Sequence, residues 1–274
     1  MINVLLWYQS TRLCKGNLQT FCPDARKGAR IHMLMPKRPF KRQQKKKRHG
    51  ANFWDHEYTN PENLALSNEP GEDFLKFTRY LRRHHPDHLT ADNVALDLGC
   101  GNGRHLQYLA HNYDMKTIGF DISRAAIKQA KLVLPSEHHQ LEVRSIAEPL
   151  PIADNTCSLI FDMMTSHFLS TVDRARLKEE IVRVATPGAL LLCKTFLRDG
   201  DLHTKRLLTE HPGPEENTYI HPTIGVPEYV YSEAELRAYL EPEFTILRVY
   251  RSHKHRFRGR ARKRRTITVY AQLL

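Results

Sequence analysis

The chain has 274 residues, enough for one large α/β domain with a substantial core and for extensions around it. Its formal charge of +12 is unevenly distributed, because residues 36–50 and 251–265 contain 17 of the 42 Lys and Arg residues and no acid. The remainder holds 25 basic against 30 acidic residues and is mildly acidic. No apolar run reaches the roughly 18 residues that a membrane helix needs, so we expect no membrane span.

The cysteines indicate the cellular compartment of the protein, and the first 50 residues indicate where the domain begins. The five cysteines are odd in number and scattered, which favours reduced thiols in the cytoplasm over a disulfide framework or a zinc site. Residues 1–50 lack sustained hydrophobic periodicity and end in the first basic run, so we expect a disordered extension ahead of a domain at 51–274. Met33 and Met35 are alternative translation starts that would shorten this extension.

The ordered part is expected to open near Phe53 and to continue into a helix at 72–84. From there strands and helices alternate, which predicts a mostly parallel sheet with helices on both faces. The expected strands are 94–98, 117–120, 141–144, 159–162, 189–196, 244–250 and 266–273, and the expected helices are 104–112, 123–134, 173–185 and 232–240. The last two strands form an antiparallel hairpin around a basic loop, for seven strands in all. Ser123 and Ser232 occupy N-cap positions, and Pro187-Gly188 is expected to separate the third of these helices from its strand.

The most informative segment joins the strand at 94–98 to the next helix through Gly99, Gly101 and Gly103. Glycines tolerate positive φ and let a ligand lie against bare backbone. The G-x-G-x-G spacing differs from the G-x-G-x-x-G of dinucleotide folds, and Asp97 just ahead would repel a pyrophosphate but suit a cation or an amino group. Asp121, at the end of the second strand, is placed to accept both ribose hydroxyls.

Together these residues resemble the cofactor site of class I S-adenosylmethionine-dependent methyltransferases, whose seven-stranded sheet also ends in an antiparallel hairpin. The likeness extends to the small tellurite-resistance-like and ubiquinone-biosynthesis-like methyltransferases, and it covers residues 54–274. It rests on Trp-Asp-His-Glu-Tyr at 54–58, Asp-Leu-Gly-Cys-Gly-Asn-Gly-Arg at 97–104, Ala-Thr-Pro-Gly-Ala-Leu-Leu-Leu at 185–192 and Tyr-Ser-Glu-Ala-Glu-Leu at 231–236.

The resemblance implies S-adenosylmethionine as cofactor and a role for each residue of the motif. Asp97 would orient the amino group of the methionine part, directly or through water, and Asp121 would accept the ribose hydroxyls. The turn would line the cofactor with backbone, and the residue after Asp121 would press on the adenine. These further predicted cofactor-binding residues are Gly99, Cys100, Gly101, Gly103 and Ile122.

The chain departs from the family pattern at two places. After the third strand the family commonly has an acid that accepts from the adenine amino group, where this chain has Ser145. We therefore expect the adenine to be held at Ser145 and Ile146, by backbone amides and apolar packing. Before the fourth strand, Cys157-Ser158 replaces a common Phe-Asp pair, whose acid we interpret as structural.

Chemistry is expected at the carboxyl ends of the strands, where residues 162–167 leave the fourth strand. His167 is a candidate proton acceptor near neutral pH, or it simply packs against Phe168. Asp162 is a candidate for orienting the substrate, or it caps the following turn. A strong base is optional, since alignment and exclusion of water supply much of the rate of methyl transfer.

The acceptor is constrained mainly by absences and by one long insertion. Residues 162–165 lack the Pro-Pro-Tyr motif typical of amino methylation on planar bases, and no cysteine follows a proline, as pyrimidine C5 methylation would require. The insertion at 197–231 is rich in polar and aromatic residues and is expected to form a substrate lid, and its histidines lack metal-ligand spacing. We expect a small-molecule acceptor. RNA or a ribosomal protein, contacted through residues 36–50 and 251–265, is the alternative, and a non-catalytic RNA-binding protein on the same scaffold is the third hypothesis.

Overall fold

The computed structural model describes residues 50–274, except residues 64, 65, 136, 253, 254, 258, 259 and 263. The predicted N-terminal extension, with nearly all of the first basic run, therefore lies outside the described residues. For residues 253–263 the described part is limited to backbone.

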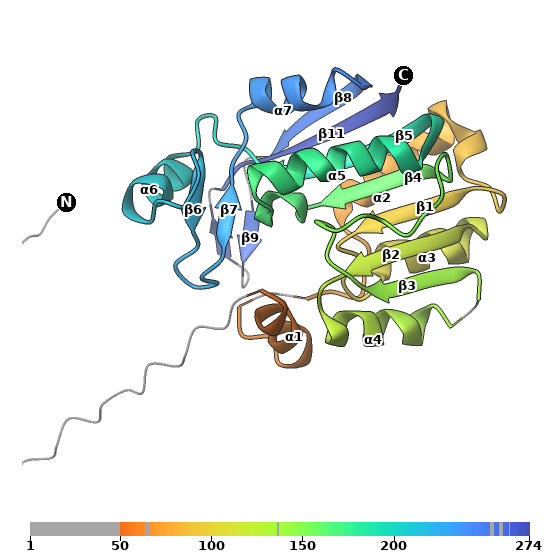
Figure 1. Cartoon of the computed structure of the whole chain (residues 1–274), viewed down its shortest axis with the longest axis horizontal. Coiled ribbons are helices and arrows are strands. Elements are labelled where there is room, and N and C mark those ends of the chain that lie inside the picture. Colours follow the sequence, from red (N-terminus) through yellow and green to blue (C-terminus); the bar gives the residue numbers. More distant parts are fainter. Residues whose placement is uncertain (1–49, 64–65, 136, 253–254, 258–259, 263) are drawn as a thin grey trace, which may run out of the picture. The chain divides into compact units, whose positions relative to one another are not determined.

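Within the described residues, seven strands form one sheet in the order β3-β2-β1-β4-β5-β11-β8 (Figure 1). Strands β3, β2, β1, β4 and β5 are parallel, whereas β11 runs antiparallel to both β5 and β8. The bounds are β1 Val94–Leu98, β2 Lys116–Asp121, β3 His139–Val143, β4 Cys157–Met163, β5 Ala185–Phe196, β8 Phe244–Ser252 and β11 Thr266–Leu273. The predicted seven-stranded, mostly parallel sheet with a C-terminal antiparallel pair is confirmed.

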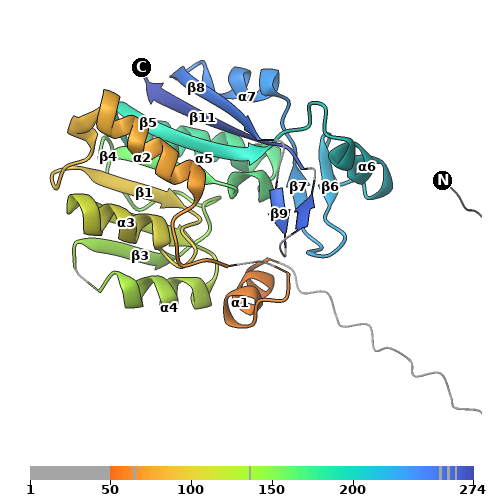
Figure 2. The same cartoon turned by 180° about the vertical axis from the view of Figure 1, so that it is seen from behind.

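Helices cover both faces of the sheet, because alternate strand residues point to opposite sides and both sides are apolar. Leu96 and Leu98 of β1 join one core cluster with residues of α5 and α7, whereas Ala95 joins a second cluster with residues of α2, α3 and α4. Figures 1 and 2 show these two layers from opposite sides. The bounds are α2 Glu72–His84, α3 Arg104–Tyr113, α4 Arg124–Val133, α5 Thr171–Val184 and α7 Glu233–Leu240.

The predicted helix caps are present, but one predicted boundary is wrong. The Ser123 hydroxyl accepts from the Ala126 amide at 3.1 Å, and Ser232 forms a reciprocal capping box with Glu235. Pro187-Gly188 does not separate helix from strand, because α5 ends at Val184 and β5 begins at Ala185. The pair lies where the β4–β5 register shifts, and Gly188 takes a φ of 75° there. A bulge at this point accommodates both residues within the strand.

Additional elements lie beyond the carboxyl ends of the parallel strands (Figures 1 and 2). The insertion at 197–231 forms a helix and a short antiparallel strand pair, with Leu207, Tyr219 and Val230 packed on Phe196 of β5. Helix α1 precedes the sheet and contacts α4. The remaining bounds are α1 Ala51–Thr59, η1 Pro86–His88, η2 Ser166–Phe168, α6 Leu202–Glu210, β6 Thr218–Ile220, β7 Pro227–Tyr229, β9 His255–Phe257 and β10 Arg260–Arg262.

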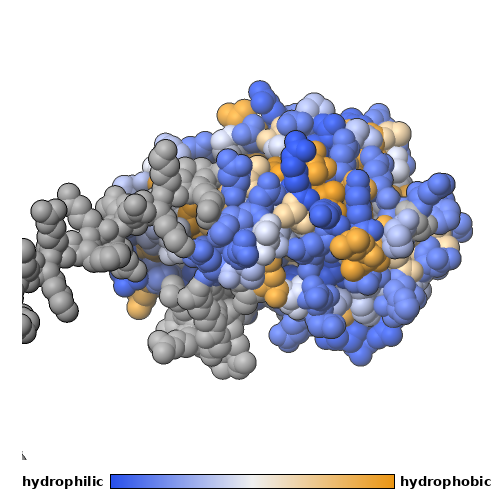
Figure 3. All heavy atoms as spheres, turned by 90° about the horizontal axis from the view of Figure 1, so that it is seen from below, coloured by the Kyte–Doolittle hydropathy of each residue, from blue (hydrophilic) through white to orange (hydrophobic). Residues whose placement is uncertain are grey.

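The face in Figure 3 is mainly hydrophilic, and its hydrophobic residues form small groups. Among the described helices, none combines the length and the apolar character that crossing a bilayer requires.

Candidate functional site

The turn between β1 and α3 has the backbone geometry that its three glycines predict. Gly99, Gly101 and Gly103 take φ angles of 82°, 56° and 77°, a left-handed region that glycine occupies without steric cost. The amides of Gly99 and Cys100 both donate to the Phe120 carbonyl, at 2.8 and 3.0 Å. These bonds fix the turn against the end of β2.

Neighbouring atoms also leave little or no room for a side chain at the three glycine positions. A Cβ on Gly99 would lie 2.3 Å from Cγ2 of Thr165, and one on Gly101 would lie 2.2 Å from the Tyr58 hydroxyl oxygen. A Cβ on Gly103 would lie 3.0 Å from Cβ of Ala130 on α4. The Cβ directions of this turn are thus occupied by side chains and a neighbouring helix. A ligand therefore has to approach the turn from its other faces.

Asp121 holds the glycine turn and the start of α4 at the same time. Its Oδ2 accepts from the Gly101 amide at 2.9 Å, and its Oδ1 accepts from the Ser123 amide at 2.8 Å. Burial raises the pKa of this carboxyl to about 6, against the lowering effect of the two amide bonds. Since a carboxylate oxygen accepts at two lone pairs, acceptor capacity remains for hydroxyl groups of a ligand.

Asp97 is a buried acid that the described residues leave incompletely satisfied. It is 1% exposed, and its Oδ2 has no hydrogen-bond partner among the described residues. His105 Nδ1 lies 3.4 Å from Oδ2, although the geometry of a hydrogen bond is not met between them. Because His105 Nε2 accepts from the Gly71 amide at 3.2 Å, the ring proton of neutral His105 lies on Nδ1. An amino group of a ligand would complete the pairing of Asp97.

Helix α1 is fastened over the glycine turn by polar contacts with α4. Oδ1 of Asp55 accepts from the Ser123 hydroxyl at 2.7 Å and from the Ala125 amide at 3.0 Å. Gln129 on α4 donates to the Tyr58 carbonyl at 2.7 Å, and the Tyr58 ring reaches Gly101. Sequence reasoning missed these roles. The Trp-Asp-His-Glu-Tyr segment at 54–58 could have indicated them, but it was interpreted only as part of the family resemblance.

The other predicted cofactor residues lie at or just after the carboxyl ends of β1, β2 and β3. The Cys100 side chain points into the core toward Gly119, so only its backbone faces the turn. Ile122 is half-buried beside Asp121, and Ile146 belongs to the core beneath the end of β3. The Ser145 hydroxyl accepts from the Ala147 amide at 3.2 Å and shapes the turn after β3. Since Asp121 pairs with Val143 of β3, the structure brings these residues together at one edge of the sheet.

The two candidate catalytic residues lie in different surroundings. Asp162 is buried, and its Oδ1 accepts from the Ser166 amide at 3.0 Å, the contact of a residue that caps the next turn. Burial raises the pKa of Asp162, against the lowering by its hydrogen bonds to Thr165 and Ser166. It borders a small cavity shared with Lys178 and Tyr239.

His167 lies in η2 and is packed between two aromatic rings. It is 1% exposed, with ring centroids 4.1 Å from Phe168 and 5.2 Å from Phe196. Neither ring nitrogen has a hydrogen-bond partner among the described residues. Burial lowers the pKa of His167 to about 4; Glu228 opposes this shift and Arg264 adds to it. The imidazole is therefore neutral at pH 7.

A buried ion pair that the sequence did not reveal lies beside His167. Both terminal nitrogens of Arg264 contact Oε2 of Glu228, at 3.2 and 3.3 Å, and the Tyr219 hydroxyl donates to the same oxygen. The guanidinium carbon lies 3.2 Å from the centroid of the Phe196 ring. Arg264 was counted in the second basic run. The interpretation that this whole run faces a polyanion does not hold for Arg264, which is buried.

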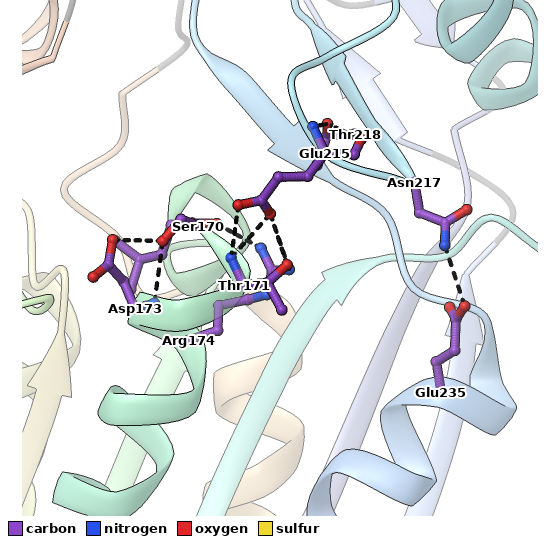
Figure 4. A network of polar contacts seen from close by, with 9 residues as sticks. Ser170, Thr171, Asp173, Arg174, Glu215, Asn217, Thr218 and Glu235 are labelled. Carbon is purple, nitrogen blue, oxygen red and sulfur yellow. Dashed lines mark hydrogen bonds and ion pairs between the residues drawn. The ribbon is translucent and has the colours of Figure 1, made fainter.

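Further polar contacts tie the insertion to the helices beneath it (Figure 4). The Glu215 carboxylate accepts from the amide and the hydroxyl of Thr171 at the start of α5, at 2.9 and 2.7 Å. Asn217 donates to Glu235 of α7 at 3.4 Å. The insertion is thereby held against both helices on this face of the sheet.

Known proteins resemble this chain in its central part. Residues 96–193 match the family described as a methyltransferase domain. Malonyl-[acyl-carrier protein] O-methyltransferase of Marinomonas sp. is 33% identical over 110 residues, covering 39% of this chain and 40% of that protein. tRNA (carboxymethyluridine(34)-5-O)-methyltransferase of Arabidopsis thaliana is 35% identical over 105 residues, covering 38% and 24%. The chain thus covers less than half the length of these relatives.

Solved structures share the fold. A SAM-dependent methyltransferase from Methanosarcina mazei superimposes with a TM-score of 0.58 at 24% identity, covering 69% of this chain and 96% of that one. Magnesium protoporphyrin IX methyltransferase from Synechocystis, solved with bound S-adenosylhomocysteine, superimposes with a TM-score of 0.53 at 16% identity, covering 74% and 83%. The glycine turn, the incompletely paired Asp97 and the acceptor capacity of Asp121 fit such a cofactor. Residues 96–193 therefore match a methyltransferase domain, and the sheet around them has the fold of these S-adenosylmethionine-dependent methyltransferases.

Proposed function

We propose that the protein transfers a methyl group from S-adenosylmethionine to a small-molecule acceptor. One observation supports a small-molecule acceptor over RNA, namely the path of the chain after β4. Thr165 packs against Gly99 of the cofactor turn, and three residues later Phe168 packs on Trp54 of α1, with ring centroids 5.2 Å apart. An acceptor beside this segment would be enclosed by α1 and the insertion. Such enclosure suits a small molecule better than a folded RNA.

The cofactor would be held by residues that the chain already positions. Asp97 would pair with its amino group, Asp121 would accept its ribose hydroxyls, and Ile122 and Ile146 would provide apolar contacts for the adenine. The backbone of the glycine turn would lie along it, with Tyr58 covering the turn from α1. When bound, S-adenosylmethionine supplies a methyl group already activated by its sulfonium sulfur.

The remaining chemistry consists of orientation, exclusion of water and the fate of one proton. Asp162 would act as a positioning residue, because its bond to the Ser166 amide orients η2, which carries His167. The neutral His167 imidazole is able to accept a proton from an acceptor hydroxyl or amine. Its aromatic neighbours exclude water, which favours alignment as the main source of rate.

A transfer assay on the full chain tests this proposal. Labelled S-adenosylmethionine is incubated with the protein and either a small-molecule extract or the RNA of the same cells. We expect label in the small-molecule fraction, equal transfer by a variant lacking residues 36–50, and loss of transfer in Asp121→Ala. Labelled RNA that disappears with the deletion would overturn the choice of acceptor.

An RNA or ribosomal-protein acceptor remains the second candidate. It is favoured by the eight Lys and Arg residues at 36–50, since such runs bind polyanions by releasing counterions. A tRNA methyltransferase is also among the relatives.

A cytoplasmic location is proposed as well, and the free state of Cys100, Cys157 and Cys193 supports it.

A further inference from the structure

His167 and Arg264 are two buried residues that each have polar atoms without a hydrogen-bond partner among the described residues. Both are more than nine-tenths buried, at 1% and 6% exposure, and both contact the Phe196 ring. Neither nitrogen of His167, nor Nε of Arg264, has a hydrogen-bond partner among the described residues. A buried polar group left without a partner is energetically costly. Such groups call for an explanation, and a bound ligand is one.

The neighbouring charged groups are already engaged. Oε2 of Glu228 accepts from Tyr219 and from both terminal nitrogens of Arg264. Arg174 of α5 donates to the Thr171 hydroxyl at 2.9 Å and to the Leu169 carbonyl, and it stacks on a tyrosine ring. What remains for a ligand is the N–H and the acceptor nitrogen of the neutral His167 ring, together with the Nε–H of Arg264.

The charge balance indicates which ligand suits this pair. Glu228 and Arg264 neutralise each other, His167 is neutral, and Arg174 lies 3.8 Å from Glu215. An anion that entered here would favour the protonated imidazole, because an opposite charge at short range stabilises the charged form. The ligand would then be compensated by His167 and hydrogen-bonded by Arg264.

We propose that His167 and Arg264 bind the carboxylate of an organic-acid acceptor, and that His167 takes up a proton as the acid binds. This inference rests on the proposed function and narrows its substrate class to small acids with an apolar body. In it His167 binds the carboxylate and no longer accepts a proton from the methylated group. Trp54, Phe168 and Phe196 would contact that body. Because both His167 nitrogens are shielded from solvent, entry requires α1 or the insertion to move.

Calorimetry with a matched pair of probes tests the inference. Benzoate and the uncharged benzamide are titrated into protein saturated with S-adenosylhomocysteine at pH 7, in buffers with different enthalpies of ionisation. We expect benzoate to bind at least about tenfold more tightly than benzamide, with uptake of about one proton. His167→Gln should abolish the proton uptake and weaken benzoate binding, while Arg206→Gln on exposed α6 should match the wild type.

A second variant guards against misfolding. Arg264→Lys keeps the charge opposite Glu228 but removes the Nε–H, so it should fold and bind benzoate more weakly. Equal affinity for both probes, binding without proton uptake, or no benzoate binding at all would overturn the inference. If S-adenosylhomocysteine binds and neutral acceptors are methylated, only this inference falls. If S-adenosylhomocysteine does not bind, the proposed function falls with it.

Discussion

Removing either partner of the buried pair between Glu228 and Arg264 should strongly destabilise the protein. The two side chains are 2% and 7% exposed, so removing one partner leaves a charge almost without solvent. Such a loss costs about 3–5 kcal/mol in known cases. For a domain of this size each kcal/mol lowers the melting temperature by about 2–4 °C, so Arg264→Met should lower it by about 6–20 °C.

Urea unfolding of Arg264→Met, Glu228→Gln and the double variant measures this effect. The double variant should be less destabilised than either single one, because it leaves no uncompensated charge. Arg206→Met is the matched control, since its ion pair with Glu210 has 60% and 54% exposed partners and should contribute less than about 1 kcal/mol. Single variants that cost no more than the Arg206 control would refute the reasoning.

Three further predictions concern the cofactor turn and a helix cap. Gly101→Ala should weaken the binding of S-adenosylhomocysteine, because the added Cβ would meet the Tyr58 hydroxyl. Adding Tyr58→Phe to this variant should partly restore binding. Gly50→Ala is the control: Gly50 also has a positive φ, 57°, but has open space around its Cβ position, so binding should be unchanged. Affinity for S-adenosylhomocysteine should rise as pH increases through about 6, where the Asp121 carboxyl ionises and becomes a full acceptor; titrations of Asp121→Asn should show no such rise. Ser232→Ala should lower the free energy of unfolding in urea by about 1 kcal/mol through loss of the capping box, and an unchanged value would contradict this.

Local sequence patterns predicted most of the sheet and the end of it at which the glycine turn and Asp121 lie. Strand β1 runs directly into the glycine turn, and Asp121 ends the next strand, β2. Because β1 and β2 are parallel, their carboxyl ends lie at the same end of the sheet, and the turn and Asp121 meet there. The caps at Ser123 and Ser232 were predictable because a cap depends on residues within one turn. Pro187-Gly188 was misplaced because a β-bulge is set by pairing with β4, a non-local interaction.

Contacts between distant segments could not be predicted from the same patterns. Arg264 stands among arginines in the sequence, and only the fold brings it to Glu228, 36 residues earlier. Asp55 caps α4 from 68 residues away. His167 carried two interpretations because its burial and its missing partners depend on the insertion folding over η2. In each case tertiary packing decides the role of the residue.

Calorimetric titration of S-adenosylhomocysteine into the full chain, beside Asp121→Ala, tests the central claim most directly. Asp154→Ala, whose side chain is 69% exposed and remote from the turn, is the control. We predict micromolar binding by the wild type and the control, and its collapse in Asp121→Ala. Absence of binding to the wild type, or equal binding by all three proteins, would contradict the assignment of the cofactor site.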